Sequence, residues 1–321
     1  MKRELTDLQK DFVNLRNGVF IHFNSATEQF HDSEIEDWDY GITEKNDPRR
    51  HEFNPASWNP TELDCEQWAQ TAISAKARFA ALTAKHHEGF CLWPTAVTEH
   101  CVRNGAYKQD VVKAYLEAFR NAGITAGLYF SMLDLQHDIT EKKCTSADKD
   151  FIKAQLRELL ENYGEIPFLI FDGWNAPWGG PRDSDLPFQE IDDFVKGIQP
   201  NCLVMNIGCV ESLKDTDVIF FENAFGQSAD ESFQGPGAAA NLYAGTWFWK
   251  DIHTTADLKT AEWAAERVKE YNRRNTCFLM NISPNNRGTV DENLRERFAE
   301  FGRLYEEIPP IEDVPEGWLY R

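Results

Sequence analysis

Short apolar runs that alternate with longer amphipathic stretches constrain the fold of this chain more than any other feature. The runs lie at 18–23, 79–85, 124–130, 166–173, 202–207, 218–223, 243–249 and 277–283. Apolar residues recur at helical spacing in most of the stretches between them. Continuous apolar strands alternating with helices indicate a parallel sheet whose outer face is covered. Eight such units predict an α/β fold, a (β/α)8 TIM-like barrel.

Two segments interrupt this alternation. Residues 24–60 form a long polar insertion after the first run, and residues 224–242 hold Gly, Ala and Ser where a clear sixth helix would be expected. Both follow predicted strands at the same end of the barrel, so we expect two long loops over the active face. The length of 321 residues fits a single barrel domain over 1–321, irregular around strand and helix six.

Composition excludes several classes of partner. A formal net charge of −20 with no basic stripe disfavours binding to nucleic acid or to an anionic membrane surface. The seven cysteines show no CxxC pair, which favours reduced thiols in a cytoplasm. The start, "MKRELTDLQKDF", lacks the apolar core of a signal peptide, and no apolar run has the length of a membrane span. We therefore expect a cytoplasmic protein.

Polar or aromatic residues terminate every predicted strand. Any one of them could be a turn or capping residue. Their convergence on the carboxyl ends of the strands, where barrel enzymes carry their catalytic groups, favours a functional site instead. The residues are His22, His86, His87, Tyr129, Asp172, Asn206, Glu222, Trp247, Trp249 and Asn281.

Asp172 and Glu222 are the most informative of these residues. Each follows a strongly apolar strand that would bury it, and buried carboxylates are costly unless they are paired or used. Two carboxylates across a pocket with Tyr and His donors and Trp walls suit glycoside hydrolysis. A separation of about 5 to 5.5 Å would retain the anomeric configuration, and roughly 6.5 to 9.5 Å would invert it.

The adjacent histidines His86 and His87 first suggest a metal site. On a regular strand they would point to opposite faces and could not chelate one ion together. The first strand offers one histidine, His22, rather than an HxH pair, and no glycine-rich phosphate loop is present. We expect neither metal nor cofactor.

Several segments, in the same order along the chain, resemble the α-L-fucosidase family, glycoside hydrolase family 29. They are "FNPASWNPTELDCEQWAQTAISAKARFAALTAKHHEGFCLWPT", "QDVVKAYLEAFRNAGITAGLYFSMLD", "FLIFDGW" and "NTCFLMNISPNNRG". The chain stops soon after the last helix, so it is similar to a short form without the C-terminal β-sandwich. The resemblance implies a retaining exo-α-L-fucosidase that acts on a fucosylated glycan, such as a small oligosaccharide or glycoconjugate, through a covalent fucosyl-enzyme intermediate.

The resemblance also implies roles for individual residues. Asp172 would be the nucleophile, with Tyr129 beside it. Other residues would bind the sugar. The histidines would hydrogen-bond the fucose hydroxyls, and the break in the second strand would turn His86 and His87 toward the sugar. Two tryptophans would line the pocket. These sugar-binding residues are His22, His86, His87, Trp38 and Trp247.

Two departures from the family pattern leave alternatives open. The stretch "GPGAAANLYAGTW" lacks the catalytic glutamate of many members, so we choose Glu222 as the acid/base, with Glu231 as second choice. The family arginine after the fifth strand is absent at Ile207. The alternatives are a related α-glycosidase of different sugar specificity, and a weakly active barrel that binds fucosylated glycans.

Overall fold

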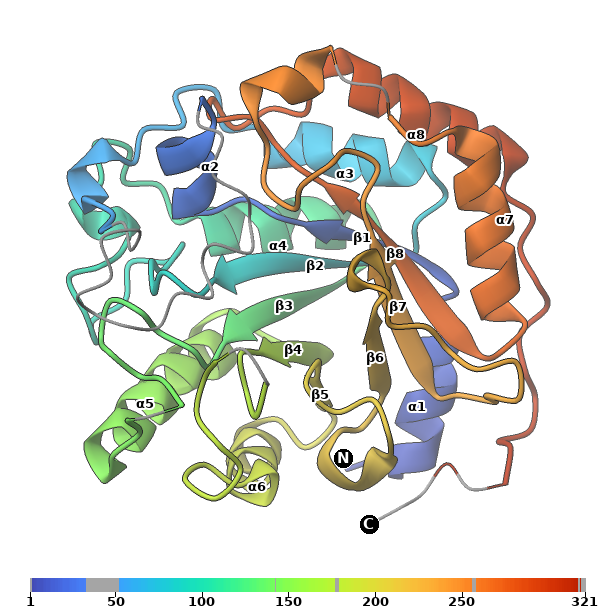
Figure 1. Ribbon diagram of the computed structural model, residues 1–321, viewed down its shortest axis with the longest axis horizontal. Coiled ribbons are helices and arrows are strands. Elements are labelled where there is room, and N and C mark those ends of the chain that lie inside the picture. The colour runs from blue at the N-terminus through green and yellow to red at the C-terminus, as the bar shows by residue number, and fades with distance from the viewer. Residues whose placement is uncertain are drawn as a thin grey trace.

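The protein folds into a barrel of parallel strands surrounded by helices, as the computed structural model in Figure 1 shows. The structure describes residues 2–32, 52–141, 143–176, 179–255, 258–316 and 318. Within them the strands are β1 (Asn17–Ile21), β2 (Phe79–Lys85), β3 (Thr125–Ser131), β4 (Phe168–Asp172), β5 (Leu203–Asn206), β6 (Ile219–Glu222), β7 (Gly237–Asn241) and β8 (Thr276–Ile282). The helices are α1 (Leu5–Val13), α2 (Ser25–Phe30), α3 (Cys65–Ser74), α4 (Val111–Asn121), α5 (Ser146–Asn162), α6 (Phe188–Ile198), α7 (Ala261–Asn272) and α8 (Glu292–Leu304). The predicted TIM-like barrel is confirmed.

The barrel is nearly closed. Hydrogen-bonded neighbours follow the order β5-β4-β3-β2-β1-β8-β7-β6, which leaves β5 and β6 at the two ends. Backbone and side-chain bonds join these ends: Asp217 N donates to Val204 O at 2.8 Å, and Val204 N donates to Asp217 Oδ2 at 2.7 Å. Asn206 N donates to Thr216 Oγ1 at 3.0 Å. We call this junction of Val204, Asn206, Thr216 and Asp217 the seam.

Strand alternation divides the apolar core into two parts. One part fills the barrel, and the other packs the outer face of the strands against the helices. Helix α1 covers the amino end of the barrel, because the Phe12 ring contacts the rings of Phe79 and Phe168 at 5.2 and 5.4 Å between centroids. The carboxyl end remains for the functional groups.

Local signals fix where the helices begin and end. The side chains of Asp64 and Asp110 accept backbone bonds at the starts of α3 and α4. Thr145 and Asp148 form a capping box at the start of α5. Gly123 and Gly164 follow α4 and α5 with φ of 74° and 73°, so the left-handed conformation that ends these helices falls on glycine.

The prediction for the seventh strand was wrong. β7 is Gly237–Asn241, whereas the predicted strand at 243–249 lies in the loop that follows it. Ala238 and Ala240 belong to the core inside the barrel. The predicted loop 224–242 is therefore wrong in its last part, because its final residues are this strand.

The predicted irregularity around the sixth unit is confirmed. A single 3-10 turn, Asn223–Phe225, follows β6 in place of a helix, and another, Leu213–Asp215, lies between β5 and β6. In the first predicted loop, 24–60, the structure describes α2 and a 3-10 turn at Pro55–Ser57, and residues 33–51 lie outside the described part.

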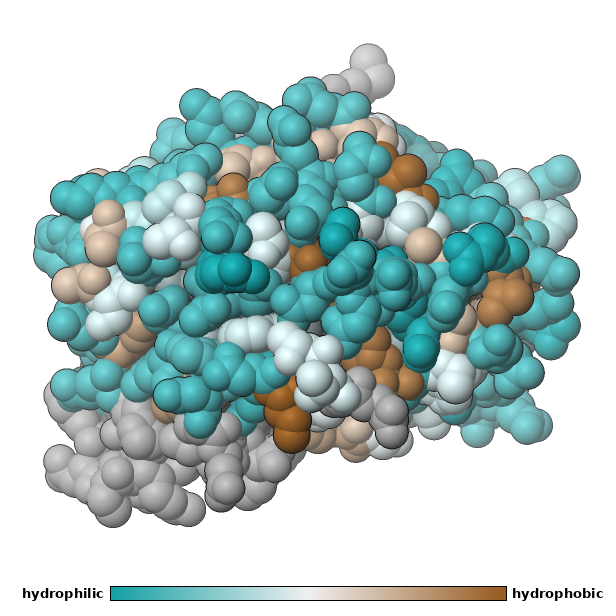
Figure 2. All heavy atoms as spheres, turned by 90° about the horizontal axis from the view of Figure 1, so that it is seen from above, coloured by the Kyte–Doolittle hydropathy of each residue, from teal (hydrophilic) through white to brown (hydrophobic). Residues whose placement is uncertain are grey.

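The face of the molecule in Figure 2 is mostly hydrophilic, with scattered hydrophobic side chains. None of the helices in the described residues is long and apolar enough to cross a membrane.

Candidate active site

Alternation along the strands carries two carboxylates into the carboxyl end of the barrel. Phe168 and Ile170 of β4 belong to the core inside the barrel, so Asp172, two residues further on, faces the interior as well. The same step leads on β6 from Phe220 to Glu222. Because parallel strands end at one edge, the two carboxylates share one end of the barrel.

Asp172 is buried and held by two hydrogen-bond donors. Tyr129 Oη donates to Asp172 Oδ2 at 2.7 Å, and Gly173 N donates to Oδ1 at 2.6 Å. His87 Nε2 lies 3.6 Å from Oδ2. Burial raises the pKa of Asp172, while the Tyr129 bond, the charge of His86 and the Gly173 bond oppose that rise. These donors stabilise the ionised carboxylate.

Glu222 has the opposite electrostatic environment. Burial, and then the negative charge of Asp172, raise the pKa of Glu222 to about 8. Its backbone N–H donates to Gln227 Oε1 at 2.8 Å, which fixes the chain where β6 ends. Glu222 therefore holds its proton at neutral pH, while the hydrogen bonds to Asp172 favour the ionised form of that carboxyl group.

A cluster of aromatic rings and histidines accompanies the carboxylates. The ring of His22 stacks on that of Trp247 with centroids 4.6 Å apart, and His86 stacks on Tyr129 at 5.6 Å. Phe248 places its ring edgewise to both histidines, at 5.4 and 4.9 Å. All five side chains are buried. The loop after β7 thus completes a cluster whose other members follow β1 and β2 or lie in β3.

The adjacent histidines lie together because β2 ends irregularly. The pairing of β2 with β3 shifts register between Thr83 and Lys85. Beyond this shift the rings of His86 and His87 have centroids 4.1 Å apart, so they share one side of the chain. The break in the strand does turn both side chains the same way, as the sequence predicted.

The proton of His22 is placed by the residue behind it. Asn281 Nδ2 donates to the carbonyl oxygen of Trp247 at 2.7 Å, which leaves Asn281 Oδ1 as an acceptor. His22 Nδ1 lies 2.7 Å from that oxygen and therefore carries the proton. Burial lowers the pKa of His22, so the ring is neutral and its Nε2 is an acceptor.

The same tautomer follows for His87. Ser131 Oγ donates its only proton to Leu133 O at 2.7 Å, so it accepts from His87 Nδ1 at 2.6 Å. Burial lowers the pKa of His87, which keeps this ring neutral as well. Glu88 Oε2 accepts from His86 Nδ1 at 3.1 Å. All three histidines are thus protonated on Nδ1.

One predicted residue, Glu231, does not join this group. Glu231 is exposed, and the nearby Ala229 O accepts from Arg274 at 2.8 Å. Arg274 lies two residues before β8, at the amino end of the barrel, so the chain around Glu231 has already left the carboxyl end. Trp38 lies outside the described residues.

Sequence reasoning missed three residues of the site. Ser131 comes two residues after Tyr129 on β3, so alternation along the strand was a usable signal for Ser131. Glu88 lies beyond the end of β2, where alternation no longer applies. Phe248 carried no signal, because it lay inside a wrongly predicted strand.

Metal binding gains no support from the site. Nowhere in the described ranges are three His, Cys, Asp or Glu side chains grouped so that they could hold a metal ion. The histidines instead use Nδ1 to bind the groups behind them.

Comparison with known proteins agrees with this geometry. The family described as Alpha-L-fucosidase matches residues 2–307. Alpha-L-fucosidase 1 of Arabidopsis thaliana is 29% identical over 314 residues, which cover 90% of this chain and 58% of that protein. The chain therefore spans less than two thirds of the length of this relative.

Solved structures share the fold. Alpha-L-fucosidase isoenzyme 1 from Paenibacillus thiaminolyticus superposes with a TM-score of 0.75 at 22% identity, covering 94% of this chain and 76% of that one. The unliganded alpha-L-fucosidase from Lactobacillus casei gives 0.74 at 19%, covering 93% and 98%. With the family match over nearly its whole length, the chain belongs to the α-L-fucosidase family.

Proposed function

We propose that this protein is a retaining exo-α-L-fucosidase that removes terminal α-L-fucosyl residues from small oligosaccharides or glycoconjugates. The observation that carries the proposal is the pair of carboxyl groups at the carboxyl end of the barrel, with Asp172 buried and Glu222 partly buried. Asp172 accepts two hydrogen bonds, whereas burial and Asp172 raise the pKa of Glu222 to about 8. One group is thereby prepared as a nucleophile and the other as a proton donor.

The proposed reaction has two steps. The Asp172 carboxylate attacks the anomeric carbon while the bond to the leaving oxygen breaks, and that oxygen takes the Glu222 proton. The product is a fucosyl ester of Asp172. The Glu222 carboxylate then takes a proton from water, whose oxygen attacks the same carbon and releases Asp172. Both carboxyl groups return to their starting protonation states.

The histidine and aromatic residues would bind fucose. Neutral histidines protonated on Nδ1 have an unprotonated Nε2, which accepts a hydrogen bond from a sugar hydroxyl. Trp247 and Phe248 supply apolar surface suited to the C5 methyl group. Tyr129 holds the nucleophile by its bond to Asp172.

We also propose a cytoplasmic location. All seven cysteines are free thiols in the structure, in keeping with a reducing compartment.

Hydrolysis of 4-nitrophenyl α-L-fucoside and fucosyllactose, with the first anomer released followed by NMR, tests the proposal. We expect α-L-fucose first, and Asp172→Asn should lower kcat by roughly 10⁴-fold on both substrates. Glu222→Ala should lower turnover of fucosyllactose by about 10²- to 10⁴-fold but spare most of that of the aryl fucoside, which needs little protonation.

Glu231→Ala is the matched control and should behave as the wild type. First release of β-L-fucose would contradict retention. Faster turnover of another glycoside would favour the related α-glycosidase, and fucose binding without hydrolysis would favour a binding barrel.

A further inference from the structure

The position of the proposed acid restricts where the rest of the substrate can lie. A general acid must reach the oxygen that leaves with the sugar next to fucose. If Glu222 has this role, that neighbouring sugar lies against the carboxyl end of β6 and the turn after it. This inference therefore rests on the proposed function.

Phe225 lies in that turn and is unusually exposed. It is the last residue of the 3-10 turn Asn223–Phe225, three positions after Glu222, and 53% of its surface is accessible. Its ring centroid is 6.5 Å from that of Trp247, and Trp247 stacks on His22. Aromatic rings thus continue from His22 and Trp247 to the turn that follows Glu222.

Single exposed apolar residues are common and by themselves indicate nothing. Phe225 differs because hydrogen bonds fix its turn. Asn223 Nδ2 donates to Tyr271 Oη at 2.7 Å and to Gln227 O at 3.0 Å, while Asn223 Oδ1 accepts from Asn241 at 2.6 Å. The ring is therefore presented to solvent on a rigid support, which reduces the entropy lost on binding.

Gly226 completes this support. It has φ of 87°, and its N–H donates to Asn223 O at 3.2 Å. Its left-handed conformation ends the turn directly after Phe225, so the ring cannot be covered by a continuing helix.

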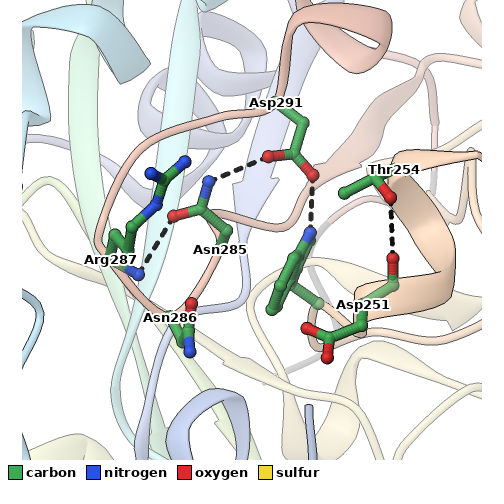
Figure 3. Close-up of a pocket in the computed structure, with 7 residues that line it drawn as sticks. Asp251, Thr254, Asn285, Asn286, Arg287 and Asp291 are labelled. Atoms are coloured by element: carbon green, nitrogen blue, oxygen red, sulfur yellow. Dashed lines mark hydrogen bonds between the residues drawn. The ribbon is translucent and has the colours of Figure 1, made fainter. Parts of the chain in front are cut away.

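A pocket of about 300 Å³ near Trp249 is the competing place for the neighbouring sugar. Figure 3 shows its lining, with Asn285 bonded to Asp291. Asp291 also accepts from Trp249 Nε1 at 2.6 Å, and Asp251 lies 3.2 Å from His31. Much of its polar lining is thus already paired, and its residues come from the segments after β7 and β8 rather than from β6.

We propose that Phe225 forms the binding platform for the sugar to which fucose is attached, by stacking on the apolar C–H face of a neutral pyranose. Pyranose rings present such a face to aromatic side chains, which bind them by apolar contact. The same short segment, residues 222–227, would then protonate the leaving sugar and recognise it.

Comparison of two substrates tests this platform. The leaving group of fucosyllactose is a sugar, whereas that of α-L-fucosyl fluoride is a fluoride ion. We expect Phe225→Ala to lower kcat/KM for fucosyllactose about tenfold, the effect of about one lost stacking contact. The same variant should hydrolyse the fluoride within about twofold of wild type, and Phe225→Tyr should retain most activity on both because it keeps the ring.

The pocket supplies the matched control. Asn286→Ala should leave both substrates unaffected, and an unchanged melting temperature should show that Phe225→Ala is folded. Equal losses on both substrates, or none on either, would overturn the platform. A selective loss in Asn286→Ala would instead place the sugar in the pocket. If the wild type cleaves the fluoride but Phe225→Ala changes kcat/KM equally for both substrates, the platform proposal is wrong and the proposed function stands. If wild type cleaves neither, the proposed function fails and the platform with it.

Discussion

Individual hydrogen bonds set the chemistry of the site residue by residue. Asn281 and Ser131 place the protons of His22 and His87 on Nδ1. In a neutral imidazole one nitrogen donates a hydrogen bond and the other accepts one. These contacts therefore decide whether the nitrogen that would face the sugar is an acceptor or a donor.

The tautomers can be read directly by long-range ¹H–¹⁵N NMR of histidine-labelled protein at neutral pH. His22 and His87 should show protonated Nδ1 and unprotonated Nε2, because Asn281 Oδ1 and Ser131 Oγ can only accept. Ser131→Ala should abolish this preference at His87 and lower kcat/KM by about three- to tenfold. Ser131→Thr keeps the hydroxyl and serves as the control, and an Nε2-protonated pattern in wild type would refute the assignment.

The raised pKa of Glu222 predicts a specific pH dependence. Only the protonated acid can donate, so kcat/KM for fucosyllactose should fall as pH rises through about 8, the pKa of Glu222. In Glu222→Gln this alkaline limb should disappear from the residual activity on the aryl fucoside. A limb that persists unchanged in the variant would assign it to another group.

At the scale of elements, the end of β2 shows how a strand irregularity positions side chains of the candidate site. Leu82 and Ala84 pack in the outer core, so regular alternation would turn Lys85 into the barrel. The register shift instead directs Lys85 outward, where its Nζ lies 3.1 Å from both Asp134 Oδ2 and Gln155 Oε1. This buried contact anchors the strand directly before His86.

Removal of one partner of this ion pair should be costly. Both side chains are fully buried, and although burial alone would raise the pKa of Asp134, Lys85 and His137 hold it well below the usual value. Lys85→Met leaves an uncompensated charge and should lower the free energy of unfolding by about 3–5 kcal/mol in urea titration. The double variant Lys85→Met/Asp134→Leu should recover much of the loss, whereas a neutral single variant would contradict a structural role.

Sequence patterns predicted most strands and the two carboxylates because both follow from alternation. Asp172 and Glu222 each come two residues after a residue inside the barrel, so the direction of their side chains was predictable. The position of β7 was not predictable. Its residues are mostly alanines, whereas the aromatic residues after it form the kind of apolar run that indicates a strand. Glu231 could not be judged either, because its position depends on where the chain turns back toward β7.

The whole molecule carries 53 acidic against 33 basic residues, and this charge should act on substrates. A field of one sign repels like-charged ligands over roughly 10 Å at 0.1 M salt. We expect kcat/KM for sialylated fucosides to rise with ionic strength and that for neutral fucosyllactose to stay nearly constant. Equal responses of the two substrates would show that the overall charge does not influence encounter.

The seam between β5 and β6 has a consequence for stereochemistry. Asp172 ends β4, next to β5, and Glu222 ends β6, so the two carboxylates stand on opposite sides of the seam. The distance between such a pair separates retention at about 5 to 5.5 Å from inversion at roughly 6.5 to 9.5 Å. Across the seam that distance is set by bonds of Thr216 and Asp217 rather than by a continuous strand ladder. In the proposed reaction, Thr216 and Asp217, both buried, would thus help to set the spacing on which the configuration of the product depends.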